Sequence, residues 1–199
     1  MRDVNIIEPS QFTSMPWRNG KGSTIELIRR DVSGEEGFAW RLSMASVVED
    51  GPFSNFSGYD RTLVLLEGAG MTLSYADNNA SSDVLDHAFQ MAQFEGERST
   101  HAKLHNGAIR DFNIMTRSAF YRAQTTCGGN ESSSNIITSA ETLLVFAATG
   151  ELNIQDHLNK SLTTPAGSLV VIEPPKEGLY TMSGDAFIAV EIYLSLIHI

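Results

Sequence analysis

Two rows of polar side chains on predicted strands are the residues of this sequence best suited to bind a small molecule. The first row, on a strand predicted from residue 40, consists of Arg41 and Ser43. The second row, on a strand predicted over residues 111–117, consists of Asp111, Asn113, Met115 and Arg117. Residues that alternate along a strand share one of its faces. Such rows are either solvated outer faces or, if the strands close into a barrel, part of the barrel's lining.

An interior placement would give these rows a definite chemistry. Arg41 and Arg117 would hold a carboxylate through paired N–H donors, and Asn113 would hydrogen-bond an amide or an imidazole. Glu26 and Asp111 are the candidate general bases, because burial raises the pKa of a carboxyl group.

Further candidate ligand contacts lie in a loop and at a corner. We expect the loop residues Trp17, Arg18 and Asn19 to close the mouth of the site. Arg61 joins the candidate lining, although the neighbouring Asp60 favours a structural ion pair at this corner.

The histidines form no metal-binding pattern. A divalent metal needs several convergent donors, and residues 40–73 contain no histidine. His101 and His105 are four residues apart, which would place them on one helix face, but residues 101–107 are predicted to be irregular. We therefore expect no bound metal and no other cofactor.

Two other motifs are weaker still. Residues 20–24, Gly-Lys-Gly-Ser-Thr, lack the earlier glycine of a phosphate-binding loop. Cys127 has no histidine near it in the sequence and lies in a Gly- and Ser-rich stretch, residues 127–135, predicted to be a flexible linker. Neither motif predicts catalysis.

The net charge and the cysteine content limit the binding partners and the cellular location that this sequence suits. A formal charge of −10 disfavours binding to nucleic acids or to anionic membranes, while leaving room for a local basic pocket. The N-terminal residues show no apolar signal segment, and no apolar run is long enough to span a membrane. The single cysteine is compatible with a reducing cytoplasm, where we expect the protein to reside.

Short apolar runs separated by turn residues predict an all-β fold with little helix. The predicted strands cover residues 23–29, 40–47, 62–66, 71–73, 88–91, 111–117, 143–147, 152–154, 169–172, 179–181 and 187–194. Residues 15–22 are predicted to be a loop, and residues 94–97 a turn. A faint repeat relates residues 62–66 with Gly70 to residues 142–146 with Gly150, which predicts two similar β-units. Chance similarity between apolar strands is the alternative.

Six motifs resemble the HutD/Ves family and occur in that family's order. They lie at residues 15–20, 40–43, 50–54, 60–63, 66–68 and 111–117. The resemblance implies a bicupin, two fused jelly-roll-like β-barrels. We divide the chain into an N-terminal barrel with its arm, 1–121, and a C-terminal barrel, 122–199, with arm strands able to cross between the halves. One departure from the family is Lys21, where relatives commonly have glycine.

The resemblance also implies a bacterial cytoplasmic protein of no settled activity. Some relatives are linked to histidine degradation and others to cold or stress responses. Our first hypothesis is a non-catalytic binding or regulatory protein for a small anionic metabolite. The alternatives are a metal-independent isomerase or hydrolase acting on a histidine-breakdown intermediate, and an interaction module with filled barrels. Exposed strand edges suit a homodimer.

Overall fold

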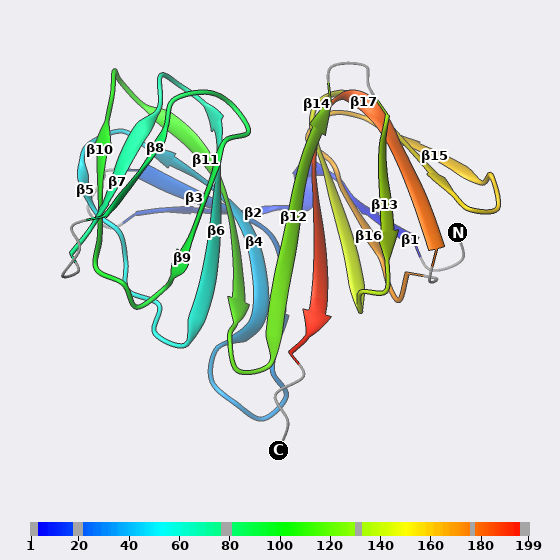
Figure 1. Cartoon of the computed structure of the whole chain (residues 1–199), viewed down its shortest axis with the longest axis horizontal. Coiled ribbons are helices and arrows are strands. Elements are labelled where there is room, and N and C mark those ends of the chain that lie inside the picture. The colour runs from blue at the N-terminus through cyan, green and yellow to red at the C-terminus, as the bar shows by residue number, and fades with distance from the viewer. Residues whose placement is uncertain (1–3, 18–21, 77–80, 130–132, 176–177, 196–199) are drawn as a thin grey trace. The chain divides into compact units, whose positions relative to one another are not determined.

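The computed structural model describes residues 4–17, 22–76, 81–129, 133–175 and 178–195. These residues form seventeen strands and one 3-10 helix, η1 (Pro9–Gln11), so the predicted all-β fold is confirmed (Figure 1). The chain divides into two compact units. We call Thr13–Phe120 the N-terminal unit, and Met1–Phe12 with Tyr121–Ile199 the C-terminal unit.

The N-terminal unit consists of two antiparallel sheets. The larger has the strand order β2 (Thr13–Pro16), β3 (Gly22–Asp31), β4 (Phe38–Val47), β11 (Ile109–Arg117), β6 (Tyr59–Glu67) and β9 (Met91–Glu95). The smaller has the order β5 (Gly51–Pro52), β10 (Thr100–Leu104), β7 (Met71–Tyr75) and β8 (Ser82–Leu85).

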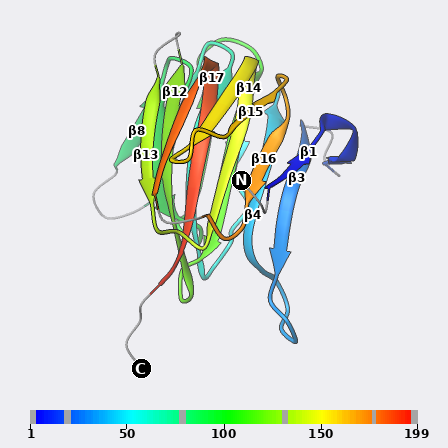
Figure 2. The same cartoon turned by 90° about the vertical axis from the view of Figure 1, so that its right-hand side faces the viewer.

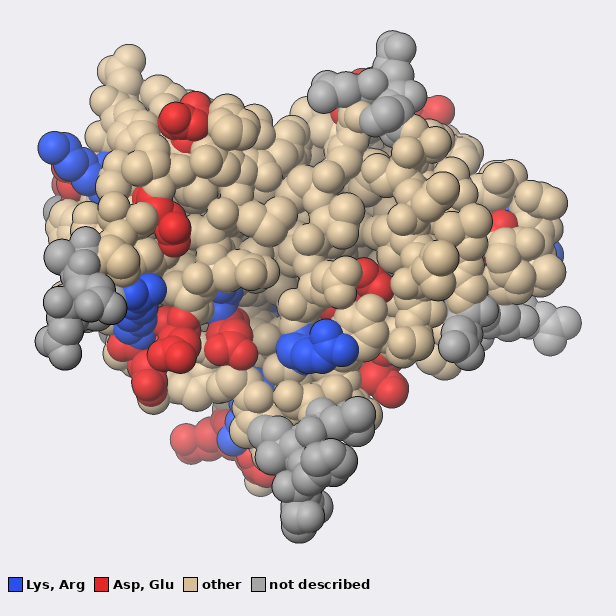
Figure 3. Space-filling view, in the orientation of Figure 1, with Lys and Arg blue, Asp and Glu red and all other residues tan. Residues whose placement is uncertain are grey.

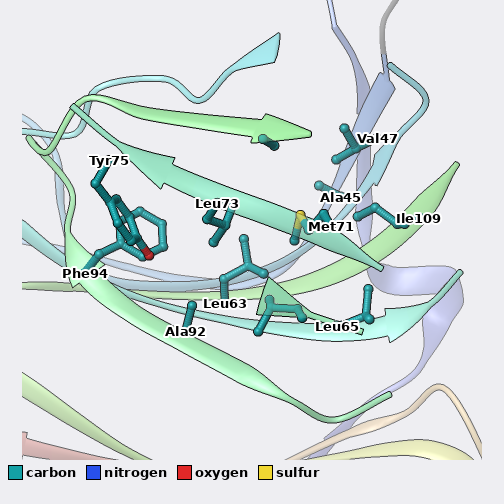
Figure 4. Packing of buried hydrophobic residues seen from close by; sticks show 12 residues of the cluster. Ala45, Val47, Leu63, Leu65, Met71, Leu73, Tyr75, Ala92, Phe94 and Ile109 are labelled. Atoms are coloured by element: carbon teal, nitrogen blue, oxygen red, sulfur yellow. The ribbon is translucent and has the colours of Figure 1, made fainter. Parts of the chain in front are cut away.

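Apolar side chains fill one end of the space between these sheets (Figure 4). Leu63 and Leu65 of β6 pack there with Met71 and Leu73 of β7, and all four are fully buried. The strand period of two puts every second residue of β6 on this inner face. Arg61 belongs to the same alternating series, so the inner face changes from apolar to cationic along one strand.

The C-terminal unit is one seven-stranded sheet. Its central path is β1 (Val4–Ile7), β16 (Leu169–Ile172), β14 (Thr142–Asp156), β17 (Gly178–Leu194) and β12 (Tyr121–Gly129) (Figure 2). The remaining strands are β13 (Ser134–Thr138), which pairs with β17, and β15 (Ser161–Thr164), which pairs with β14. Because β1 pairs with β16, the described residues 4–12 group with the C-terminal unit.

The sequence repeat corresponds to a structural one. Strand β6 lies between β11 and β9, and β14 lies between β17 and β16. Val64 stands opposite Met91 in the first unit, and Leu144 stands opposite Val171 in the second. Both members of this pair differ by 80 residues between the units, the same offset as in the repeated motif. The chance alternative is therefore disfavoured.

Four local predictions were wrong. Met15 and Pro16 form part of β2, Ala88 and Phe89 form a turn before β9 and not a strand, Phe94 and Glu95 end β9, and residues 101–104 belong to β10. In β10 the buried Thr100 and Ala102 alternate with the exposed His101 and Lys103, a strand pattern that its polar residues concealed.

The predicted linker is also mostly strand, since Cys127 to Gly129 end β12 and Ser134 begins β13. A Cβ atom on Gly128 would lie 2.3 Å from the Phe187 ring. The glycine there permits close packing and does not mark a flexible segment. Burial raises the pKa of the Cys127 thiol to about 11, which disfavours a nucleophilic thiolate.

The described part of the chain contains no helix with the length and hydrophobicity of a transmembrane segment. On the face drawn in Figure 3, the described basic side chains form no continuous patch, in line with the net charge of −10.

Candidate functional site

A cavity of about 470 Å³ opens in the N-terminal unit, beside its apolar core. Seven residues that the sequence predicted as ligand contacts line it: Trp17, Arg41, Ser43, Arg61, Asp111, Asn113 and Met115. Five members of the two polar rows therefore face the interior of the unit and not the solvent: Arg41, Ser43, Asp111, Asn113 and Met115.

Three adjacent strands bring the polar side chains together. Met115 of the central strand β11 stands opposite Arg41 of β4 on one side and opposite Arg61 of β6 on the other. Neighbouring strands are about 4.8 Å apart, so the backbones at the two arginines are about 10 Å apart. Two residues further along, Asn113 stands opposite Ser43, and Asp111 follows opposite Ala45. The cavity lining is therefore cationic on both sides of β11 at Met115. It carries a carboxyl group four residues away on the same strand, at Asp111.

A hydrogen-bonded relay connects three of these residues. The Arg61 guanidinium donates through Nη2 to Asn113 Oδ1 at 2.7 Å, and Asn113 Nδ2 donates to Asp111 Oδ1 at 2.7 Å. The bond from Arg61 fixes which end of the amide faces Asp111, because a guanidinium only donates. Asp111 Oδ2 has no hydrogen-bond partner, although the residue is fully buried.

Arg61 is a buried cation among aromatic rings. Only 7% of the residue is exposed, and its guanidinium carbon lies 5.1–5.6 Å from the ring centres of Phe53, Phe56 and Phe94. Burial lowers its pKa to about 10, against the attraction of Asp111. The side chain stays protonated at neutral pH, and cation–π contacts stabilise it there.

Burial changes the pKa of Asp111 in the opposite direction. Burial raises the pKa of its carboxyl group to about 7, although Arg61 and the hydrogen bond from Asn113 both act to lower it. A carboxyl group with such a pKa can exchange a proton near neutral pH.

Of the two cations in the described part of the cavity lining, Arg41 is the more accessible. It is half-buried, donates through Nη2 to Met115 Sδ at 3.3 Å, and lies 4.9 Å and 5.4 Å from the ring centres of Phe38 and Phe56. Its Nε–H has no hydrogen-bond partner. Burial lowers its pKa, and the nearby Glu26 opposes that change.

Trp17 reaches the cavity because a glycine stands beside it. The indole Nε1–H donates to Thr24 Oγ1 at 2.8 Å. A Cβ atom on Gly22 would lie 2.2 Å from the Ser46 carbonyl oxygen and 2.9 Å from the Trp17 ring. The glycine in the motif 20–24 thus permits close packing.

Gly22→Ala is expected to displace Trp17 and to lower the free energy of unfolding by about 1–3 kcal/mol, the usual range for overpacking. Tryptophan emission and urea unfolding measure the two effects. Gly51→Ala is the matched control, because a Cβ atom there would meet nothing within 4 Å. An unchanged emission spectrum together with unchanged stability would contradict this packing.

Other predicted contacts lie elsewhere or are not described. Arg117 forms an ion pair with Glu35 and lies over the Phe120 ring, and it does not line this cavity. Glu26 is absent from the cavity lining, and Arg18, Asn19 and Lys21 lie outside the described residues.

The predicted Asp60–Arg61 ion pair is also wrong. Strand alternation puts the exposed Asp60 on the opposite face from the buried Arg61, whose Nη1 donates to the Ser54 carbonyl oxygen at 3.5 Å.

One wall of the cavity is a corner whose residues were not among the predicted ligand contacts. Ten unpredicted residues line the cavity: Thr24, Ala45, Val47, Glu49, Asp50, Gly51, Pro52, Phe53, Ser54 and Phe56. Asp50 Oδ1 accepts the Leu104 amide N–H at 2.7 Å, which ties this corner to β10. The Asp-Gly-Pro sequence signals a turn but not the direction in which that turn points.

Among the described residues, no group of three or more His, Cys, Asp or Glu side chains is placed to hold a metal ion. His101 lies on β10 and not in an irregular loop, while His105 Nε2 is hydrogen-bonded to Thr72 Oγ1 at 2.9 Å.

The sequence matches the HutD family over residues 9–190. This chain belongs to the HutD family. It is 38% identical over 154 residues to an uncharacterized 21.2 kDa protein from the hutC 3′ region of Pseudomonas putida, covering 77% of this chain and 78% of that protein. It is also 38% identical over 105 residues to Protein Ves of Escherichia fergusonii, covering 51% of each chain.

Two solved structures match this chain over nearly its whole length. A conserved protein of unknown function from Pseudomonas aeruginosa PAO1 matches with a TM-score of 0.84 at 35% identity, covering 96% of this chain and 99% of that one. HutD from Pseudomonas fluorescens SBW25 matches with a TM-score of 0.81 at 29% identity, with the same coverage.

A more distant match concerns the fold alone. Oxalate decarboxylase of Lactobacillus farciminis has a TM-score of 0.65 at 7% identity, covering 100% of this chain and 87% of that one. The bicupin fold of this HutD-family chain is thereby confirmed.

Proposed function

We propose that this HutD-family protein binds a small carboxylate metabolite in the cavity of its N-terminal unit and acts as a non-catalytic binding or regulatory protein. The observation that carries the proposal is the pair of guanidinium groups, Arg41 and Arg61, on either side of Met115 in a cavity of about 470 Å³. Ligand pockets of this size suit small metabolites, and arginine is the side chain that matches carboxylate geometry best.

The cavity offers two positive charges to a bound anion. These two guanidinium groups lie among aromatic rings, and the described lining also contains three carboxyl-bearing residues, Glu49, Asp50 and Asp111. Asp111 offsets part of the guanidinium charge, and burial raises the pKa of its carboxyl group to about 7, so this offset is incomplete near neutral pH. An added carboxylate would find two weakly hydrated guanidinium groups, whose interaction with it strengthens away from bulk water.

The names of two relatives support the choice of candidate ligands. The gene of the Pseudomonas putida relative lies in the hutC 3′ region, and a solved structure with this fold is a HutD. We therefore propose an acid of histidine degradation as the ligand, with urocanate and formylglutamate as the first compounds to test. We also propose a cytoplasmic location. The homodimer stays a prediction that light scattering on the purified protein tests.

Isothermal titration calorimetry against these acids tests the proposal, and Arg41→Gln is the informative variant. A hydrogen bond to a charged group contributes about 1.5–3 kcal/mol, so the variant is expected to lose on the order of 10- to 100-fold in affinity. No heat with any acid at millimolar concentrations would count against the proposal.

Arg110→Gln is the matched control for Arg41→Gln. Arg110 also contacts a methionine sulfur, Met44 Sδ at 3.5 Å, and pairs with Glu67 at 2.8 Å, but it does not line the cavity. Its substitution should leave affinity within about twofold, since surface ion pairs contribute little. Equal losses in both variants would contradict a specific role for Arg41.

Asp111 supports a second candidate function, that of a metal-independent enzyme. Its raised pKa and unpartnered Oδ2 are the properties of a general base. Incubation with urocanate and formylglutamate, followed by mass spectrometry, tests this candidate. Turnover that disappears in Asp111→Asn would support it, whereas unchanged acids after long incubation would remove it.

A further inference from the structure

The Arg61 guanidinium has two anions to stabilise in the proposed complex, the Asp111 carboxylate and the carboxylate of the ligand. Arg61 Nη2 donates to Asn113 Oδ1, and Asn113 Nδ2 donates to Asp111 Oδ1, at 2.7 Å each. Asp111 has no exposed surface, and its Oδ2 accepts no hydrogen bond from the described residues. A carboxylate that is removed from solvent and accepts one hydrogen bond is stabilised mainly by its nearby cation. The charge of Asp111 therefore depends on what else Arg61 binds.

A ligand anion at Arg61 favours the protonated form of Asp111. A second negative charge beside the same cation disfavours ionisation of the first acid, as in carboxyl pairs that share one site. The ligand also displaces water from the cavity, which removes solvent that would otherwise stabilise a charge. Burial raises the pKa of Asp111 to about 7 in the free protein, so a further rise in the complex falls in the range just above neutral pH.

Other charged and titratable side chains surround Asp111 and the two cavity arginines in the described part of the N-terminal unit. They are Arg41 on β4, Arg61 on β6, Glu49 and Asp50 in the turn after β4, Glu26 on β3 and Tyr75 on β7. Among them, Arg61 has the largest effect on Asp111. Burial lowers the pKa of Arg61 to about 10 and raises that of Tyr75, so both keep their charge state around neutral pH.

We infer that carboxylate binding in this cavity is linked to proton uptake: when an anion binds at Arg61, Asp111 takes up a proton from the solvent. The proton adds to the Asp111 carboxylate and the ligand stays ionised, so no covalent bond of the ligand changes. The inference rests on the proposed function, because it assumes that a carboxylate binds in this cavity. It adds a regulation of that site by pH. Affinity is highest below about pH 6, where Asp111 is protonated with or without ligand, and falls as pH rises through the free and the ligand-bound pKa of this residue.

Calorimetry with formylglutamate and 3-phenylacrylate tests the linkage. The carboxyl groups of both acids stay ionised above about pH 6, so neither ligand exchanges protons itself. Titrations at about pH 7.5 in HEPES and in Tris give the proton uptake, because the two buffers release protons with different enthalpies. If binding raises the pKa of Asp111 by about one unit, the wild type takes up roughly 0.5 proton per ligand at this pH. Its affinity is then expected to fall about sevenfold between pH 6 and pH 8.5.

Asp111→Asn provides the second arm of the test, because asparagine has the shape of the protonated carboxyl group and cannot titrate. The variant is expected to take up less than about 0.1 proton and to bind at pH 6 and pH 8.5 with affinities within about twofold of each other. Asp83→Asn is the matched control. Asp83 accepts a hydrogen bond from the Tyr75 hydroxyl at 2.6 Å but does not line the cavity, so proton uptake should persist in this variant.

The outcomes separate the inference from the proposed function. Binding of either acid to the wild type without proton uptake would overturn the linkage and leave the carboxylate site intact. Uptake that persists in Asp111→Asn would show that another group takes the proton and would also overturn the inference. Absence of binding by both acids, and by every other carboxylate tested, would remove the carboxylate site and the inference together. A far-ultraviolet circular dichroism spectrum of each variant establishes that it is folded.

Discussion

Arg61→Met is expected to weaken carboxylate binding severely, with a loss of affinity of at least ~30-fold. Truncating one partner of a buried, hydrogen-bonded charge pair costs about 2–5 kcal/mol or more, and the Arg61 guanidinium is the most deeply buried cation of the cavity lining. Calorimetry with an acid that binds the wild type measures the loss.

Methionine keeps most of the length of the arginine side chain and suits the three surrounding rings. The fold should therefore persist, with Asp111 protonated at neutral pH once its cation has been removed. Arg98→Met is the matched control: Arg98 lies 4.0 Å from the Tyr75 ring centre but does not line the cavity. Binding by Arg61→Met within tenfold of the wild type would contradict the role given to Arg61.

Asp111→Asn is expected to stabilise the protein at pH 8 by up to about 4 kcal/mol, and to change its stability little at pH 4. The pKa of Asp111 is about 7 in the folded protein, against an ordinary value of 3.8. Between these pH values the folded protein holds a proton that the unfolded chain has released, so the free energy of unfolding falls as pH rises. Above pH 7 the free energy of unfolding of the wild type is lower than at acid pH by the full amount, up to about 4 kcal/mol.

Urea unfolding of variant and wild type at pH 4, 6 and 8 measures this difference. Asparagine has the shape of the protonated carboxyl group, so the variant keeps the relay but not the titration. Glu36→Gln, at an exposed position outside the cavity, provides the control and should show little change at any of the three pH values. A stabilisation that is equal at pH 4 and pH 8 would contradict the buried titration of Asp111.

Alternation along strands made much of the site predictable. Arg41 and Ser43 share a face in the sequence pattern, and Asp111, Asn113 and Met115 share another, as they do in the structure. Pattern alone did not decide whether those faces pointed inward, because polar rows on strands usually face solvent. The family resemblance implied a barrel fold, in which one face of each strand points inward. The matches to HutD proteins confirmed the family.

Other features depend on the path of the chain in space. The corner formed by residues 50–54 reaches the cavity because Phe53 and Asp50 are hydrogen-bonded to β10. This strand was not predicted from the sequence, because its exposed residues His101 and Lys103 are polar. Arg117 follows the alternation of its row, but near the end of β11 it pairs with Glu35 instead of reaching the cavity. Periodicity predicts a face of a strand, whereas the extent of a cavity along that face depends on tertiary contacts.

The side-chain Nε–H signals of Arg41 and Arg61, followed by nuclear magnetic resonance during titration with an acid, test the carboxylate site most directly. The variants Arg41→Gln and Arg61→Met assign the two signals, and Arg98 and Arg110 serve as references outside the cavity. We predict that urocanate moves the Arg41 and Arg61 signals, that its neutral amide moves neither, and that the references stay in place. Signals of Arg41 and Arg61 that remain unmoved at millimolar acid, or that move equally with the amide, would contradict a carboxylate site between these two arginines.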